Sequence, residues 1–206
     1  MLFAIELVLS LIALVVALWL RPWRMLRGAL LTPTLAALVV LPGLWLLPQT
    51  LPQGLQIQLS GACLLVLMLG WPLAVLVLAG VALSVGLLGQ ADLAAVVSQW
   101  LWVGLMPATV AMVIGAVLRR WLPANLFIYT LGRAFMGTAV AVFFSGFMME
   151  LLHRLAGAPA MEQALVGRWL MAWGDAFLTG MFATIFVAFV PQWLATWSDA
   201  RYLDSR

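Results

Sequence analysis

The chain has 206 residues, of which 66% are hydrophobic and 8% are charged, and its formal net charge is +3 at pH 7. This composition excludes an ordinary soluble domain and indicates a polytopic membrane protein, because each crossing needs about 20 apolar residues. The sequence contains no lysine. The absence of lysine excludes a P-loop and Schiff-base chemistry, so an ATPase that drives transport would be a separate chain.

The isoelectric point near 10 does not indicate a nucleic-acid partner, because the excess charge is small and the arginines gather at the ends of apolar segments. Cys63 is the single cysteine, which excludes an intrachain disulfide and a thiolate metal cluster. His153 has no serine or cysteine partner in a catalytic pattern, so we expect no enzyme activity and no cofactor.

The apolar segments predict an all-α transmembrane helix bundle of about six to seven spans, with seven preferred. The first span covers 2–20 and is not a cleaved signal, because the basic residues follow it, within 21–27. By the positive-inside rule that loop is cytoplasmic, so the N-terminus lies outside and the C-terminus inside. The second span covers 29–47, and the uncharged residues 48–57 suit an outer loop.

Residues 58–89 allow two interpretations, because Gly70, Trp71 and Pro72 interrupt the apolar run. One tilted helix would fit the length. A hairpin that turns at these three residues is preferred, since proline breaks a helix and glycine permits the turn. The first arm of the hairpin is short for a span, so we expect it to be partly re-entrant.

Three further spans are predicted at 94–118, 124–149 and 168–190, with an outer loop at 150–167. The transmembrane bundle therefore covers 1–190, and 191–206 forms a cytoplasmic interfacial tail. The aromatic residues of this tail either anchor it in the lipid headgroups or dock a cytoplasmic partner. They are Trp193, Trp197 and Tyr202.

Within the last span, the run from 169 to 190 contains a single acid, Asp175, with Thr179 one turn below it. A carboxylate inside a bilayer costs about 2.5–3.5 kcal/mol on insertion scales, and such groups usually line the interior of a bundle. Small residues recur at every fourth position and predict a smooth face for close helix packing. They are Ala172, Ala176, Gly180, Thr184 and Ala188.

Arg133 and Asp175 are the ionisable groups set deepest in the predicted spans, at depths that differ by less than about 10 Å. One interpretation is a core polar site made of Asp175, Thr179 and Gly180, with Arg133 as the charge partner. The other is a buried ion pair that only fixes helix register. A second small-residue face, made of Gly137, Ala141 and Ser145, would let the two spans approach each other.

Glu150, His153 and Arg168 are the candidate polar residues of the outer surface. Glu150 and His153 have the i, i+3 spacing that di-iron bundles use, but those bundles use it twice. With a single histidine in the chain, an exposed loop pair is the preferred interpretation, and no metal-ligand set is predicted.

Several segments of the chain resemble a bacterial family of integral membrane proteins. They are LPANLFIY at 122–129, Phe135, Gly137, WGDAFLTG at 173–180, PQW at 191–193 and DARYL at 199–203. Their order resembles the cobalt/nickel-uptake membrane component of CbiM type in energy-coupling-factor transporters. The resemblance implies a substrate-binding subunit of the bacterial cytoplasmic (inner) membrane that works with a separate coupling membrane subunit and ATPase chains.

The family's metal ligands are not matched by this chain. Relatives carry an N-terminal Met-His pair, whereas this sequence begins Met-Leu-Phe and has Gln56 and Gln58 where a further histidine is expected. Arg168 stands where another histidine would be, and together with Arg133 it would favour an anion. Ni(II) or Co(II) needs several nitrogen ligands. The chain is therefore either an uptake component, for a metal or another small solute, or a non-transporting scaffold or assembly protein on the same fold.

Overall fold

The computed structural model describes residues 2–26, 28–46, 49–50, 56–157 and 164–202. Apart from one antiparallel pair of two-residue strands, β1 (Gln49–Thr50) and β2 (Gln56–Ile57), the regular structure of this part is helical. Six of its helices are long and apolar enough to cross a membrane. The predicted all-α membrane bundle is confirmed.

The first two predicted spans correspond to α1 (Leu2–Trp19) and α2 (Leu31–Leu46). The short 3₁₀ turns η1 (Pro22–Arg24) and η2 (Gly28–Leu30) connect them. Most of the outward face of α1 is apolar and exposed. Such a face suits lipid, since a helix satisfies its own backbone there. Arg27 lies outside the described residues, as do 47–48 and 51–55 of the predicted outer loop.

The preferred hairpin is confirmed, because the chain breaks at Gly70 into α3 (Ala62–Leu69) and α4 (Trp71–Gly89). Gly70 has φ 75° and ψ 160°, a conformation that residues with a Cβ rarely adopt. Pro72 follows in the first turn of α4, where its missing N–H leaves no bond unmade. The eight residues of α3 extend about 12 Å, so the non-helical residues 58–61 complete this crossing.

The fifth and sixth spans each contain a π-helical segment. One continuous helix is formed by α5 (Leu93–Gln99), η3 (Trp100–Leu105) and α6 (Met106–Trp121). The next consists of η4 (Ile128–Met136) and α7 (Gly137–Leu155), and α8 (Ala164–Phe189) forms the last span. The π-helical segments are η3 and η4. The π-helical geometry is rare and often occurs at functional sites.

The predicted outer loop 150–167 is wrong at both ends. The helix α7 continues to Leu155, so Glu150 and His153 lie in its last turns and not in a loop. The helix α8 begins at Ala164, so Arg168 belongs to its first turns. Glu162 lies outside the described residues. Polar residues at these span ends did not stop the helices, because Glu150 pairs with Arg154 and Arg168 bonds Met149 while the backbone stays helical.

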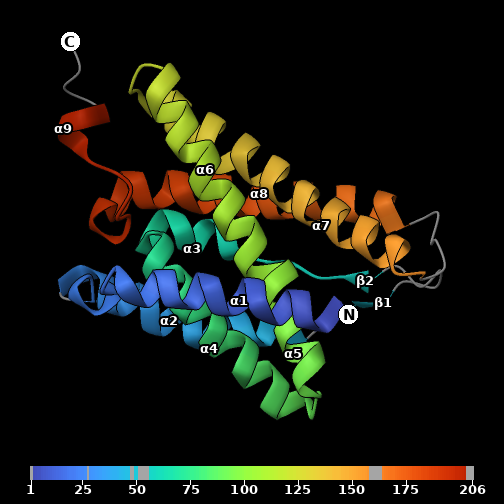
Figure 1. The fold of residues 1–206 in the computed structure, drawn as a ribbon. Coiled ribbons are helices and arrows are strands. Elements are labelled where there is room, and N and C mark those ends of the chain that lie inside the picture. Colours follow the sequence, from blue (N-terminus) through green and yellow to red (C-terminus); the bar gives the residue numbers. More distant parts are fainter. Residues whose placement is uncertain (1, 27, 47–48, 51–55, 158–163, 203–206) are drawn as a thin grey trace.

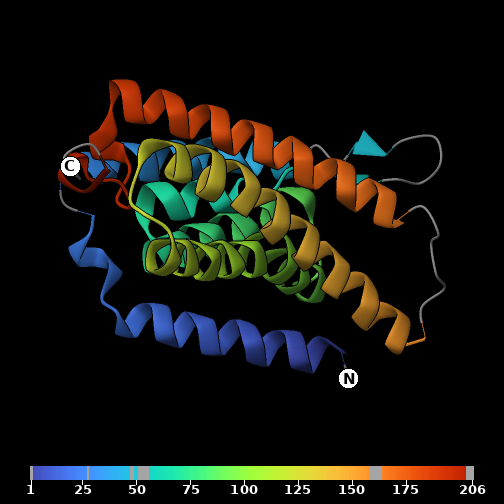
Figure 2. The same ribbon diagram turned by 90° about the horizontal axis from the view of Figure 1, so that it is seen from above.

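The termini lie at opposite ends of the bundle (Figures 1 and 2). In the described part of the chain, the six long helices and the composite crossing through α3 make seven crossings. An odd number of crossings leaves the two ends of the chain on opposite sides. The η1–η2 turn, the end of α6 and the C-terminal tail lie at one end (Figure 1). That grouping agrees with the predicted placement of these segments on one side, and which side faces the cytoplasm stays a prediction.

The helix α3 lies in the middle of the bundle (Figure 2), and seven of its residues are buried. The tail folds back onto its carboxyl end through η5 (Pro191–Trp193) and α9 (Asp199–Tyr202). The backbone N–H of Ala195 donates to the Met68 carbonyl at 2.9 Å, and the Thr196 hydroxyl donates to the Leu67 carbonyl at 2.8 Å. The tail therefore caps a helix that is too short to cross by itself.

The small-residue faces of α7 and α8 are buried over much of their length, and the two helices pack against each other. On α8 the face is buried at Ala172, Ala176 and Gly180 but exposed at Thr184 and Ala188. On α7 it is buried at all three predicted positions, which are Gly137, Ala141 and Ser145.

Candidate functional site

Asp175 on α8 lies at the amino end of α3, where its side chain is only 2% exposed. Its Oδ2 accepts a hydrogen bond from the Ser60 N–H at 2.8 Å, and its Oδ1 accepts one from the Gly61 N–H at 3.1 Å. A carboxylate at this position binds the free N–H groups at a helix start and is favoured by the helix dipole. Asp175 therefore acts as a cap that a distant helix supplies to α3.

Ser60 connects this cap to two further elements, α2 and η3. Its carbonyl accepts a hydrogen bond from the buried Trp45 indole at 3.0 Å. Its hydroxyl donates to the Val103 carbonyl at 2.5 Å and accepts from the Ala62 N–H at 3.1 Å. The backbone N–H and C=O groups of Ser60 and Gly61 are thus all bonded within the protein, which is the condition for non-helical backbone inside a bilayer.

Gly61 lets the chain enter α3 at this point. Its φ is 66°, in the left-handed region, and a Cβ built on it would lie 2.7 Å from Leu41 Cδ2. Both the backbone angle and the close approach of α2 therefore favour glycine. On the opposite side, a Cβ on Gly174 would lie 3.3 Å from Leu59 Cδ2, so α8 also passes close to the entering chain.

Asp175 and Thr179 come together as predicted, whereas Gly180 does not join them. The two side chains and Gly61 line a cleft of about 220 Å³ between α2, α3 and α8, whose other lining residues are apolar. Gly180 lies on another face of α8, where a Cβ would lie 3.2 Å from Phe135 Cβ. It therefore serves close packing against η4 and not the polar site.

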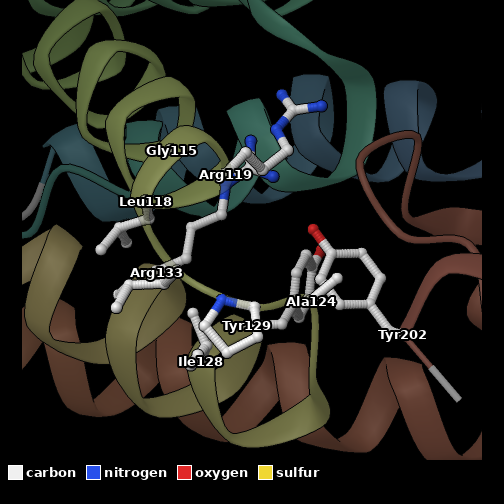
Figure 3. A pocket seen from close by; sticks show the side chains of 10 residues that line it. Gly115, Leu118, Arg119, Ala124, Ile128, Tyr129, Arg133 and Tyr202 are labelled. Carbon is white, nitrogen blue, oxygen red and sulfur yellow. The ribbon is translucent and has the colours of Figure 1, made fainter. Parts of the chain in front are cut away.

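The predicted contact between Asp175 and Arg133 does not form. Arg133 lies in a separate pocket beside Gly115, Arg119 and Tyr129 (Figure 3), and the ion pair of the described residues is Arg154 with Glu150 at 3.2 Å. Depth along a straight helix gave no information about direction around the helix axis. The π-helical turn of η4 changes that direction, and backbone N–H groups already satisfy Asp175.

The candidate outer residues separate into two groups. Glu150 pairs with Arg154 along α7, and His153 is half-buried in the same turns. Arg168 points inward, where its Nη2 donates to the Met149 sulfur at 3.3 Å. Arg168 also lines a pocket of about 50 Å³ with Gln58 and Ser60, directly beside the cap. Only Arg168 of the predicted outer set therefore reaches the candidate site.

The donor set does not fit a cobalt or nickel site. Among the residues that the structure describes, no three His, Cys, Asp or Glu side chains lie together in a group that could hold a metal ion. Cys63 is buried and its thiol faces the Pro107 carbonyl at 3.7 Å. The oxygens of Asp175 are engaged by backbone N–H groups. Square-planar capture of either ion needs several nitrogen ligands, which this site does not offer.

Sequence reasoning missed two polar features of the bundle interior. The first is Ser60 with Gly61, for which a polar residue and a glycine ahead of an apolar run was the available signal. The second is Glu6 on α1, which is 6% exposed. Its Oε1 accepts hydrogen bonds from the Trp102 indole at 2.7 Å and the Ser98 hydroxyl at 3.2 Å. An isolated acid in an otherwise apolar first span was the signal for this second feature.

Comparisons of the chain with protein-family models, with curated proteins and with solved structures find no match. The family resemblance of the C-terminal half therefore stays an expectation. The function is argued from the Asp175 cap and from the pocket that Arg168 lines.

Proposed function

We propose that the chain is the membrane-embedded, solute-binding component of an uptake system of the energy-coupling-factor type, in the bacterial inner membrane. The observation that supports this most is the discontinuous crossing, in which Asp175 holds the non-helical backbone of Ser60 and Gly61. Transporters commonly build substrate sites from such interrupted segments near mid-membrane. A protein whose helices only anchor it has no need of an interrupted crossing.

The solute pocket in this proposal is the one lined by Gln58, Ser60 and Arg168. Its volume of about 50 Å³ is enough for a few water molecules or a small ion, since one water needs at least about 10–15 Å³ by this measure. A guanidinium and an amide are donors that suit a small anionic or strongly polar solute. The cobalt or nickel version of the proposal is weaker, because the donors around Asp175 do not suit either ion.

A scaffold or assembly protein is the second candidate function, and one observation favours it. Both oxygens of Asp175 already accept backbone hydrogen bonds, so the acid needs no ligand to be stable. In this alternative the cap only fixes the position of α3, as buried polar groups do in other bundles. The two candidates differ in whether the pocket of Arg168 binds a solute.

Thermal unfolding of the purified chain in lipid nanodiscs tests the proposal. The probes are small inorganic anions, small neutral polar solutes, Co²⁺ and Ni²⁺, because a ligand that binds only the folded state raises its stability. We expect at least one anion or polar solute to stabilise the wild type but not Arg168→Gln. Arg154→Gln is the matched control, since Arg154 lies at the same end of the bundle but outside the pocket.

Two results contradict the uptake proposal. One is the absence of stabilisation by every probe. The other is an equal loss of the response in Arg168→Gln and Arg154→Gln.

Purification of the tagged chain from its own cells adds a second arm. Recovery of a coupling membrane protein with ATPase subunits supports uptake, whereas recovery with a different membrane assembly supports the scaffold.

A further inference from the structure

A pocket at the end of the bundle that carries the tail contains two arginines. It measures about 350 Å³ and lies between the end of α6, the start of η4 and α9. Arg133 reaches across it toward α6, whose Arg119 lines the same pocket (Figure 3). Tyr129 and Tyr202 form another part of the wall. The pocket is distinct from the one that contains Arg168, and the two charged residues of its lining are both arginines.

Arg133 is buried without a charge partner among the described residues. It is 6% exposed, and its Nε and Nη1 atoms have no hydrogen-bond partner. The described carboxylates are engaged elsewhere. Their partners are Trp102 for Glu6, Ala95 for Asp92, Arg154 for Glu150, Ser60 and Gly61 for Asp175, and Trp197 for Asp199. A buried guanidinium without a counter-charge is unfavourable, so this position favours an anion from outside the chain.

The neighbours of Arg133 orient it but do not neutralise it. The Arg133 Cζ lies 5.8 Å from the centre of the Tyr129 ring, within cation–π range. The Tyr129 hydroxyl lies 2.9 Å from the Thr196 hydroxyl. Since the single Thr196 hydrogen points to Leu67, Tyr129 must donate its own to Thr196. Tyr129 therefore has no free hydrogen for the pocket, and the polar hydrogens of the other lining side chains belong to Arg119, Arg133 and Tyr202.

Gly115 makes the position of Arg133 possible. A Cβ built on Gly115 would lie 2.5 Å from the Arg133 Nε and 2.9 Å from its Cζ. The guanidinium therefore lies against the bare backbone of α6, at the wall of the pocket. Arg133 also belongs to the π-helical segment η4, and departures from α-helical geometry of this kind occur frequently at functional sites.

From this geometry we infer that the pocket of Arg119 and Arg133 binds a phosphate group. Guanidinium groups match the oxygens of phosphate with paired hydrogen bonds, and two of them balance its charge. The pocket lies at the end of the bundle that the arginine distribution predicts to be cytoplasmic, where basic pockets between membrane helices bind lipid phosphate. The same chemistry serves free phosphate and a phospholipid headgroup. The inference does not depend on the uptake proposal.

The purified full-length chain in nanodiscs tests the inference and separates the two sources. The first arm uses phosphatidylcholine nanodiscs and titrates inorganic phosphate against chloride at constant ionic strength. The second arm leaves phosphate out and replaces part of the lipid with phosphatidylglycerol or cardiolipin. Thermal unfolding is measured in both. Stabilisation in the first arm identifies free phosphate, and stabilisation only in the second identifies an anionic headgroup; either result supports the site.

Three arginine variants make the test specific. We expect Arg133→Gln to weaken binding roughly tenfold or more, as loss of a charged hydrogen-bonding group does, and Arg119→Gln to weaken it less. Arg120→Gln is the matched control, since Arg120 neighbours Arg119 but does not line the pocket. Without phosphate or anionic lipid, Arg133→Gln should be at least as stable as the wild type, because it removes an unpaired buried charge.

A fourth variant keeps every charge. Gly115→Ala should displace the Arg133 guanidinium and reduce the response, whereas Gly43→Ala should not, since a Cβ at Gly43 meets nothing within 4 Å. Three results overturn the inference: no response of the wild type in either arm, an equal loss in Arg120→Gln, or unfolding of Arg133→Gln where the wild type without phosphate is folded. The last would show that Arg133 already has an internal partner.

Discussion

Ser60 and Asp175 lie 115 positions apart in the chain, and the Ser60 N–H donates to the Asp175 Oδ2 at 2.8 Å. With the neighbouring bond from Gly61, this contact joins the start of α3 to the middle of α8. The carboxyl end of α3 is held by the tail, through the carbonyls of Leu67 and Met68. A helix of eight residues is marginal by itself, so both of its ends depend on distant parts of the chain.

Asp175→Asn should lower the free energy of unfolding by about 1–3 kcal/mol, the usual effect of leaving a buried donor unpaired. An amide has a single acceptor oxygen, so one of the two N–H groups, of Ser60 or Gly61, would face an NH₂ group. The measurement is unfolding in mixed micelles as the denaturing detergent increases. Asp92→Asn is the control, because Asp92 caps α5 from an exposed position and asparagine caps equally well. Equal stability of the two variants would contradict the capping role of Asp175.

Gly61→Ala should be more destabilising than Gly28→Ala. Both residues have positive φ, 66° and 79°, but only Gly61 has a neighbour, Leu41, in the way of a Cβ. The backbone term alone is about 1–2 kcal/mol, and it is shared by the two variants. Leu41→Ala in the Gly61→Ala background should recover part of the difference, because it removes the clash. Thermal unfolding of the wild type, the three single variants Gly61→Ala, Gly28→Ala and Leu41→Ala, and the double variant measures this, and additive effects of Gly61→Ala and Leu41→Ala would exclude the clash.

The apolar pattern predicted the positions of the spans well, because the length of a span and the position of a helix break depend on residues that are close together in the sequence. The break at Gly70 and the burial of Asp175 are two examples. The partner of Asp175 could not be predicted in the same way. It depends on the path of the non-helical residues 58–61, which have no periodic pattern, and on the direction of Arg133, which the π-helical turn of η4 changes. The apolar pattern gives the depth of a residue in the membrane. To predict which residues touch inside the bundle, the rotation of each helix about its own axis must also be known.

Trp102→Phe should destabilise the bundle by about 1–3 kcal/mol, because Glu6 then keeps only the longer bond from Ser98 in a buried position. Phenylalanine retains most of the apolar packing of the indole, so the loss reports mainly on the hydrogen bond. Glu150→Gln is the control, since it breaks the partly exposed pair with Arg154, and such pairs contribute about 0–1 kcal/mol. Detergent unfolding compares the two variants. A smaller effect for Trp102→Phe would mean that the carboxylate of Glu6 reaches water.

Thr196→Val should detach the tail from the bundle more easily, because the Thr196 hydroxyl bonds both the Leu67 carbonyl and the Tyr129 hydroxyl. The expected loss is about 1–2 kcal/mol, as for a buried hydroxyl pair. Tyr129→Phe removes the same contact from the other side, so the double variant should be less destabilised than the sum of the two single variants. Thr130→Val is the control, since its hydroxyl bonds only the Leu126 carbonyl from an exposed position. Proteolysis of the tail, followed with time, measures its release. Strict additivity of Thr196→Val and Tyr129→Phe would contradict the role of the hydroxyl pair and leave the edge-to-face contacts of the Tyr129 ring with Trp197 and Tyr202 to hold the tail.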